Sequence, residues 1–454
     1  MFRIKENINK IKTNPIFGLI KHRDFRTILI GEFVSTLGDQ FYLVALPWLI
    51  LQITGSAFAM GTIYAVGTIP SAFFVVVGGI LTDKFSSRKV MILSNVARMI
   101  LVGMLGFMVL KGAVTLPILY IFSFFFGIAD AFFFPAQRTI VFKIVPKNKL
   151  TAGNAIIQGI TQLSAFLGPG LAGFIIAWLS GFKPGRLFLE KKFLLTAHSS
   201  DFVASSRSVG LSLLIDAATF AFSVMTLLVV KALNDKGENI NVVEITSFWC
   251  SFKEVFVQIW KDHLLRGFGM IICILYLFTI GPLTTGLPFL ANLKLSGGVA
   301  DLGILLSSLG GGVLMGVLIA GVFNPKRKRK VITFLVACGF CMGISLILLP
   351  LLEVTWIISL ICVMMGVCIG YTTIMMITFL QKRVPEEMVG RIMGIAMFSY
   401  TGLLPFSHFI SGGLIQLNYT WFFIFCGIIT IFVTVYSSMQ RELRSELEKF
   451  LNTF

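Results

Sequence analysis

Continuous apolar runs, each about as long as a lipid bilayer is thick, constrain this chain more than any other feature. A transmembrane helix needs about 20 predominantly apolar residues, whereas a transmembrane strand needs about 10 and alternates apolar with polar positions. The chain is 56% hydrophobic and only 13% charged, which excludes a soluble globular protein. Twelve such runs occur, at 27–51, 57–81, 89–110, 115–136, 152–180, 209–230, 265–289, 301–323, 331–350, 355–379, 390–415 and 420–438. The sequence therefore predicts an all-α membrane protein with twelve transmembrane helices.

The predicted spans form two groups of six, separated by a polar segment. A Val-Pro pair ends a helix in the equivalent loop of each group, at Val145-Pro146 and at Val384-Pro385. This repeat favours two pseudo-symmetric bundles with a substrate site between them, near the middle of the membrane. The predicted parts are a basic N-terminal segment at 1–26, a first bundle at 27–230, a linker with an amphipathic helix at 231–263, a second bundle at 264–438 and a tail at 439–454.

The net charge of +17 is distributed unevenly along the chain. With a cytoplasmic N-terminus, 30 of the 38 Lys and Arg residues fall in cytoplasmic segments and 7 fall outside, while Arg98 lies within a span. This asymmetry follows the positive-inside rule and predicts that both termini are cytoplasmic. The basic run at 326–330 is then interpreted as an anchor to anionic lipids of the inner leaflet, and not as a nucleic-acid contact.

Four stretches of the sequence resemble a known family. They are LGDQFYLVALPWLILQITGSA at 37–57, GGILTDKFSSRK at 78–89, LLIDAATFAFS at 213–223 and RVPEEMVGRIMG at 383–394. On these stretches the chain resembles the major facilitator superfamily, and within it the branch of macrolide efflux proteins and siderophore exporters. The resemblance implies a transporter of the bacterial plasma membrane, without cofactor or metal, and not an enzyme. The chain departs from the pattern at Ser86, where a glycine is common, and at Asp216, where relatives usually have a neutral residue.

The loop between predicted spans two and three resembles the signature loop of that superfamily. Its residues are Gly79, Asp83, Lys84, Arg88 and Lys89. The resemblance implies that Asp83 meets the positive N-terminal end of span eleven and closes the cytoplasmic side, a placement worth about 0.3–1 kcal/mol to a carboxylate. A solvated loop charge is the alternative. The sequence GPGLAG at 168–173 resembles an exporter motif, with simple helix packing as the competing interpretation.

Ionisable residues inside the predicted spans are concentrated in the first bundle. They are Glu32, Asp39, Asp130 and Asp216, with Arg98 as the base. An isolated charge at mid-membrane costs at least about 2.5–3.5 kcal/mol, so such residues face the interior of a bundle or a cavity. On span one, Glu32 and Asp39 share a helix face with Ser35, Thr36 and Tyr42. We interpret the five charged residues as proton-coupling residues, Asp39 foremost. The alternative for Asp39 is a structural acid locked to Arg98 or to a neighbouring hydroxyl group.

Aromatic and amide side chains are the predicted lining of the substrate cavity. They are Phe41, Tyr42, Trp48, Gln158, Gln162, Tyr276 and Tyr371. The net acidity of the first bundle favours a neutral or cationic amphiphile as substrate. An anionic siderophore is an alternative if Arg98 is free to meet it.

Other functional classes find less support in the sequence. No GxxxxGK[ST] loop is present, so ATP is not expected to drive the protein directly. The four histidines show no metal-ligand spacing, which argues against a membrane-embedded enzyme. We predict a monomeric, proton-coupled exporter of small hydrophobic molecules such as drugs or macrolides, whose partners are its substrate, protons and membrane lipids. A siderophore exporter of the same fold is the nearest alternative, and a channel or a non-transporting receptor is the alternative of another class.

Overall fold

The computed structural model describes residue 19 and residues 21–146, 149–181, 199–230, 263–322, 328–383 and 386–440. Its helices in the first half of the chain are α3 (Arg23–Thr54), α4 (Ala57–Lys84), α5 (Ser87–Leu110), α6 (Leu116–Ile144), α7 (Leu150–Leu179) and α8 (Ser199–Val229). Those in the second half are α10 (His263–Gly281), η4 (Pro282–Gly286), α11 (Leu287–Lys294), α12 (Val299–Val322), α13 (Lys328–Leu348), η5 (Leu349–Leu351), α14 (Thr355–Arg383) and α15 (Glu386–Met439). The predicted linker helix, most of the 181–208 insert, and most of the N-terminal segment and tail lie outside the described residues.

Eleven helical segments of the described chain are long and apolar enough to cross a membrane, and one of them consists of two helices joined at a kink. That segment is α15, which leaves helical geometry at Asn418, where φ is −161° and ψ is 107°. The Asn418 side chain accepts a hydrogen bond from Trp421 N at 3.1 Å, as the N-cap of the returning helix does. The predicted all-α fold with twelve spans is confirmed.

Span seven is one helical span, as predicted at 265–289, and it contains a π-helical turn. The α-helical segments α10 and α11 are joined by the π-helical turn η4, which begins at Pro282. Proline lacks a backbone N–H and disturbs the hydrogen-bond ladder of the preceding turn. Gly281 packs there against Ser411 of α15, which leaves no room for a side chain. The irregular turn is therefore held against span eleven.

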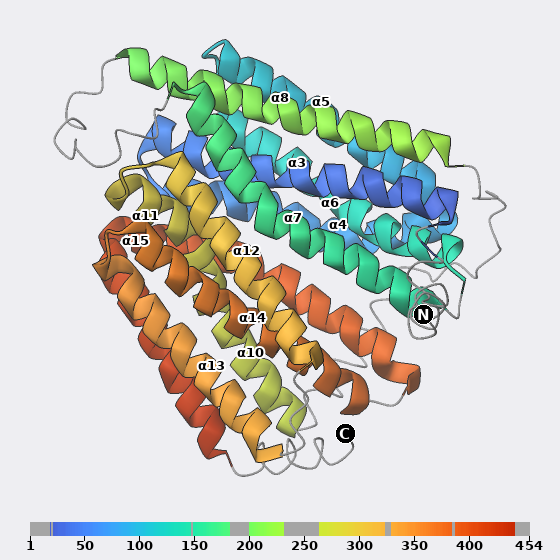
Figure 1. Cartoon of the computed structure of the whole chain (residues 1–454), viewed down its shortest axis with the longest axis vertical. Helices are drawn as coiled ribbons and strands as arrows, with labels where there is room; N and C mark the ends of the chain where they lie inside the picture. Colours follow the sequence, from blue (N-terminus) through green and yellow to red (C-terminus); the bar gives the residue numbers. More distant parts are fainter. Residues whose placement is uncertain are drawn as a thin grey trace, which may run out of the picture.

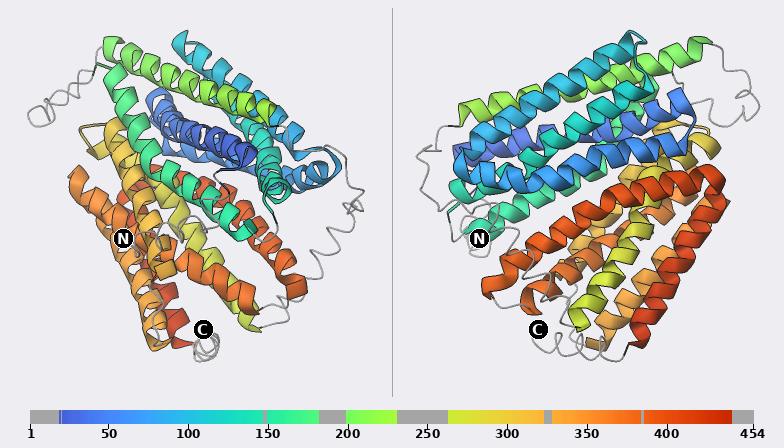
Figure 2. Two further views of the ribbon diagram at one scale, coloured as in Figure 1. Left: turned by 45° about the vertical axis from the view of Figure 1, so that its right-hand side comes forward. Right: turned by 180° about the vertical axis from the view of Figure 1, so that it is seen from behind.

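The two halves of the chain form two helical bundles that meet at one end of the molecule (Figures 1 and 2). We call the end that carries Arg23, Lys84 and Met439 the terminal end, and the end that carries Thr54, Ala57 and Asn418 the opposite end. In all views the ribbons of the two bundles converge at the opposite end and separate towards the terminal end.

Two seams of closely packed helices join the bundles, α4 with α15 and α7 with α12. In the α7–α12 seam, a Cβ atom built on Gly173 would lie 2.9 Å from the Cα of Gly303, so two glycines face each other. Small residues let membrane helices approach this closely. Gly170 N also donates to Ser307 Oγ at 2.7 Å across the seam. The GPGLAG stretch therefore packs one bundle against the other.

Candidate functional site

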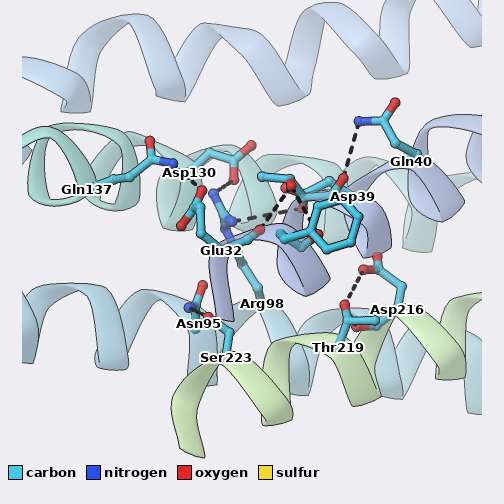
Figure 3. Close-up of polar contacts among 12 residues, drawn as sticks. Glu32, Asp39, Gln40, Asn95, Arg98, Asp130, Gln137, Asp216, Thr219 and Ser223 are labelled. Carbon is cyan, nitrogen blue, oxygen red and sulfur yellow. Dashed lines mark hydrogen bonds and ion pairs between the residues drawn. The ribbon is translucent and has the colours of Figure 1, made fainter. Parts of the chain in front are cut away.

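Four helices of the first bundle bring the predicted charged residues together (Figure 3). Glu32 and Asp39 come from α3, Arg98 from α5, Asp130 from α6 and Asp216 from α8. Glu32 and Asp39 are seven positions apart, so they lie two turns apart on one face of α3. Each of the five residues lies several turns from both ends of its helix, and therefore away from the loops.

Arg98 makes its direct ion pair with Asp130, through Nη2. Its second terminal nitrogen, Nη1, is 3.9 Å from Asp39 Oδ1, and neither Nη1 nor Nε has a hydrogen-bond partner in the described part of the chain. The Arg98 side chain is 1% exposed, whereas those of Asp130 and Asp39 are 25% and 33% exposed. Arg98 is thus fixed to Asp130, and Asp39 lies beside the guanidinium without a hydrogen bond to it.

Aromatic rings surround the guanidinium of Arg98. Its Cζ atom is 4.1 Å from the ring centre of Phe133, and it is 5.5–5.8 Å from the ring centres of Phe126, Phe134 and Phe220. The face of an aromatic ring attracts a cation within about 6 Å, and more strongly where water is excluded. These rings replace part of the hydration that Arg98 loses by burial.

Glu32 occupies a separate polar contact, nearer to the terminal end. It is buried, and it accepts a hydrogen bond from Gln137 Nε2 of α6. One turn further along α3, Thr36 Oγ1 and Ser164 Oγ of α7 are 2.9 Å apart. The polar stripe of α3 therefore contacts α6 and α7 as well as Arg98.

Asp216 lies on the other side of α3, where a glycine makes room for it. Asp216 is fully buried, and its Oδ1 atom is 3.4 Å from Thr219 Oγ1. A Cβ atom built on Gly38 would lie 2.6 Å from Asp216 Oδ1, so only a glycine fits beside this carboxyl group. Close by, Asn95 Nδ2 donates to Ser223 Oγ at 3.0 Å. The carboxyl group of Asp216 is therefore enclosed between α3 and α8.

The charges of this cluster do not balance when all its groups are ionised. Arg98 is one base beside four carboxyl groups, and a buried carboxylate without a counter-charge is costly. The carboxyl groups are close enough for the charge of Asp39 to act on both Glu32 and Asp216. In the described residues no three acidic, histidine or cysteine side chains are arranged to hold a metal ion.

The signature-loop residues are only partly described. The side chains of Asp83 and Lys84 lie outside the described residues, so the predicted contact of Asp83 with span eleven stays a prediction. Arg88 donates from Nε to Leu227 O at 2.8 Å and from Nη2 to Leu228 O at 2.7 Å, which caps the C-terminal end of α8. Gly79 has no neighbouring atom within 4 Å of a built Cβ, and Lys89 is exposed.

The residues predicted to line a substrate cavity occupy different surroundings. Three are buried in packed apolar clusters, namely Phe41, Trp48 and Tyr371. Tyr42 is half-buried and stacks on Phe126, with ring centres 4.4 Å apart. Gln162 and Tyr276 are half-buried, and Gln158 is exposed. Their contact with a substrate stays a prediction.

Sequence reasoning missed several partners of the cluster. Gln137 lies seven residues after Asp130 on α6, and Phe220 lies four residues after Asp216 on α8. Both spacings place the two residues of each pair on one helix face, and that is the signal by which they could have been found. Gly38 precedes Asp39 directly, but nothing in the sequence indicates which helix packs against it.

Comparison with known proteins agrees with this architecture. Residues 28–407 match the Major Facilitator Superfamily. Macrolide efflux protein A of Streptococcus pyogenes is 22% identical over 430 residues, which covers 92% of this chain and 96% of that protein. The multidrug efflux pump Tap of Mycolicibacterium fortuitum is 22% identical over 379 residues, covering 81% of this chain and 83% of that protein.

Solved structures show the same fold. The crystal structure of a mutant of the nucleoside transporter NupG has a TM-score of 0.68 at 14% identity, covering 95% of this chain and 100% of that one. A bacterial homologue of the iron transporter ferroportin in an inward-facing state has a TM-score of 0.65 at 14% identity, covering 92% and 99%. The chain therefore belongs to the major facilitator superfamily, a family of multi-pass membrane transporters and not of enzymes.

Proposed function

We propose that this transporter is a proton-coupled exporter, an antiporter that moves small hydrophobic organic molecules such as drugs or macrolides out of the cell by alternating access. The observation that carries the proposal is the position of Asp39. It is partly exposed and lies 3.9 Å from a guanidinium that is bound directly to a different carboxylate, Asp130. Asp39 can therefore gain or lose a proton without breaking the ion pair that holds Arg98.

Proton exchange at Asp39 would change the charge that a substrate meets. With Asp39 ionised, the partly exposed side of the cluster is negative and attracts a cationic or polarised amphiphile. With Asp39 protonated, that attraction falls, and the substrate is released. A membrane potential contributes about 2.3 kcal/mol per charge per 100 mV, so one inward proton can drive an approximately fifty-fold concentration ratio of a neutral substrate.

The arrangement of the bundles fits one state of such a cycle. The contacts described between the bundles lie towards the opposite end, at the α4–α15 and α7–α12 seams. With the termini in the cytoplasm of a bacterium, as the distribution of Lys and Arg predicts, this is a state closed to the outside. Rocking of the two bundles about the site between them would then expose the cluster to the other side of the membrane.

Siderophore export is less well supported by this geometry than drug export. The anionic substrate would need a free Arg98, and Arg98 is 1% exposed, paired with Asp130 and surrounded by phenylalanine rings. A channel or a receptor would not require the charge imbalance of the cluster. The efflux relatives named above also favour a drug or macrolide as substrate.

Transport by reconstituted protein tests the proposal. Proteoliposomes loaded with a pH-sensitive dye should show macrolide movement coupled to proton movement in the opposite direction, and Asp39→Asn should abolish the coupling. Asp301→Asn is the matched control, because Asp301 lies outside the cluster, where it accepts a hydrogen bond from Gly297 N at 2.7 Å beside the start of α12. Macrolide flux that ignores an imposed pH gradient in the parent protein would refute proton coupling. In a pump-deficient host that expresses the protein, secretion of an iron chelator without a change in macrolide tolerance would favour the siderophore alternative.

A further inference from the structure

The opposite end of the α4–α15 seam contains a contact in which one bundle caps a helix of the other. Gln416 of α15 accepts two hydrogen bonds through Oε1, from Ala57 N at 3.0 Å and from Ser56 Oγ at 3.1 Å. Ser56 is the N-cap of α4, and its hydroxyl also accepts from Ala59 N at 3.2 Å. The first amides of a helix have no partner within the helix, so Gln416 supplies one from across the seam.

The residues below Gln416 explain why its side chain reaches α4. On α15, Gly412 and His408 lie four and eight positions before Gln416, on the same helix face. Gly412 meets Gly61 of α4, where a Cβ built on Gly412 would lie 2.9 Å from the Gly61 Cα. One turn deeper, the ring of His408 is 5.2 Å from that of Tyr64. The seam thus has three layers, a ring contact, a glycine crossing and the capping hydrogen bonds.

We infer that Gln416 is a latch residue that sets how readily the bundles part at the opposite end. Its two hydrogen bonds join the bundles and are lost when α4 and α15 separate, because their donors belong to the other bundle. The glycine crossing beneath them is apolar and is set by shape alone. The amide of Gln416 therefore gives the closed seam a specific hydrogen-bond contribution. This inference rests on the proposed movement of the bundles, and it assigns a role to a residue outside the charged cluster.

Substitutions at Gln416 separate hydrogen bonding from packing. Gln416→Leu keeps a side chain of similar size and removes the acceptor. Gln416→Glu keeps an acceptor for both donors, and a carboxylate is favourable at the N-terminus of a helix. Loss of the acceptor should change the ratio of open to closed protein about two- to tenfold, as the net value of ordinary hydrogen bonds implies. Gln416→Glu should leave the ratio unchanged or shift it towards the closed state.

The experiment measures the distance between the bundles directly. Spin labels are attached to cysteines introduced at Ala113, which is exposed between α5 and α6, and at Val354, which is exposed before α14. The seven native cysteines are first replaced, and the protein is held in lipid nanodiscs at a pH and macrolide concentration where the parent shows both distances. Pulsed dipolar spectroscopy then gives the two populations for the parent, Gln416→Leu and Gln416→Glu.

The outcomes distinguish the latch from the proposed function. A larger long-distance population in Gln416→Leu, with Gln416→Glu like the parent or more closed, supports the latch. Equal populations in all three proteins, or the same opening in both variants, would overturn it, since hydrogen bonding would then not matter. If the parent shows one distance at every pH and macrolide concentration, the alternating-access proposal fails and the latch fails with it. Hydrogen exchange at the Ala57 amide provides a second measurement, and faster exchange in Gln416→Leu alone is the expected result.

Discussion

Replacement of Asp130 and of Asp39 by asparagine should affect stability very differently, although both carboxylates lie beside Arg98. Asp130→Asn removes the direct ion pair and leaves a guanidinium that is 1% exposed without a bonded carboxylate. Removing one partner of a buried pair typically costs about 3–5 kcal/mol. We expect the lower end of this range, because Asp130 is 25% exposed and Asp39 can move towards Arg98.

Asp39→Asn removes an attraction and several repulsions at once. At 3.9 Å, the attraction between Arg98 and Asp39 is about 1 kcal/mol in water and about 4 kcal/mol at an effective dielectric constant of 20. Because Asp39 is partly exposed to solvent, the attraction between Arg98 and Asp39 should lie nearer to about 1 kcal/mol than to about 4 kcal/mol. The same substitution removes the repulsion of Asp39 by Asp130 and its repulsive action on Asp216 and Glu32. We therefore expect stability within about 1 kcal/mol of the parent, together with loss of proton coupling.

Thermal unfolding of the purified protein in detergent, followed by tryptophan fluorescence, compares the two variants. Asp130→Asn should give the larger fall in melting temperature, and Arg98→Gln combined with Asp130→Asn should recover part of it, because no guanidinium is then buried without its bonded carboxylate. Asp301→Asn serves as the control for loss of a carboxyl group elsewhere. If Asp39→Asn destabilises the protein as much as Asp130→Asn does, Arg98 is shared equally between the two carboxylates and the reasoning is wrong.

Two further substitutions test the surroundings of the cluster and of the signature loop. Gly38→Ala should destabilise the protein by about 1–3 kcal/mol and lower transport, because the new methyl group would overlap Asp216 and Thr219. The control is Gly159→Ala, because a Cβ atom built on Gly159 has no neighbouring atom within 4 Å. This control should change the melting temperature little in the same assay. Arg88→Gln should increase hydrogen exchange in the last turn of α8, because two backbone carbonyls lose their donors, whereas Lys89→Gln should leave exchange unchanged. Equal melting temperatures for the two glycine variants would contradict the packing argument, and unchanged exchange in Arg88→Gln would contradict the capping role.

The spans themselves were predictable because hydrophobic length is a local property of the sequence. The predicted run 57–81 corresponds to α4, and the predicted break between 415 and 420 corresponds to the kink at Asn418. The π-helical turn within span seven was not predicted, since a single proline in an apolar run can be accommodated by a kink or by such a turn. Which of these forms depends on the packing of Gly281 against α15.

The membership of the charged cluster was also predictable, because ionisable residues are rare in apolar spans. The pairing within it was not. Asp39 and Asp130 are on different helices, and the choice of Asp130 as the partner of Arg98 depends on how α3, α5 and α6 cross. The predicted cavity lining was harder still, since lipid and protein core are equally apolar and helix periodicity gives little information about which face is buried. Tyr371, for example, is buried in an apolar cluster of the second bundle, and its contact with a substrate stays a prediction.

The hydrogen bonds described across the two seams have a common direction. In the α4–α15 seam the first bundle supplies the N–H of Ala57, and in the α7–α12 seam it supplies the N–H of Gly170, while the acceptors are the side chains of Gln416 and Ser307. A backbone donor persists through almost any substitution except proline. The backbone donor at Ala57 therefore does not depend on the side chain at that position, whereas Gly170 must stay a glycine, because a Cβ atom built there would lie 2.9 Å from Ser307 Oγ. The hydroxyl of Ser56 is a further donor of the first bundle, and it is lost if Ser56 is replaced by an apolar residue. A chimera that joins the first bundle of a relative to this second bundle should accordingly keep the Gly170 contact only where the relative has a glycine at that position.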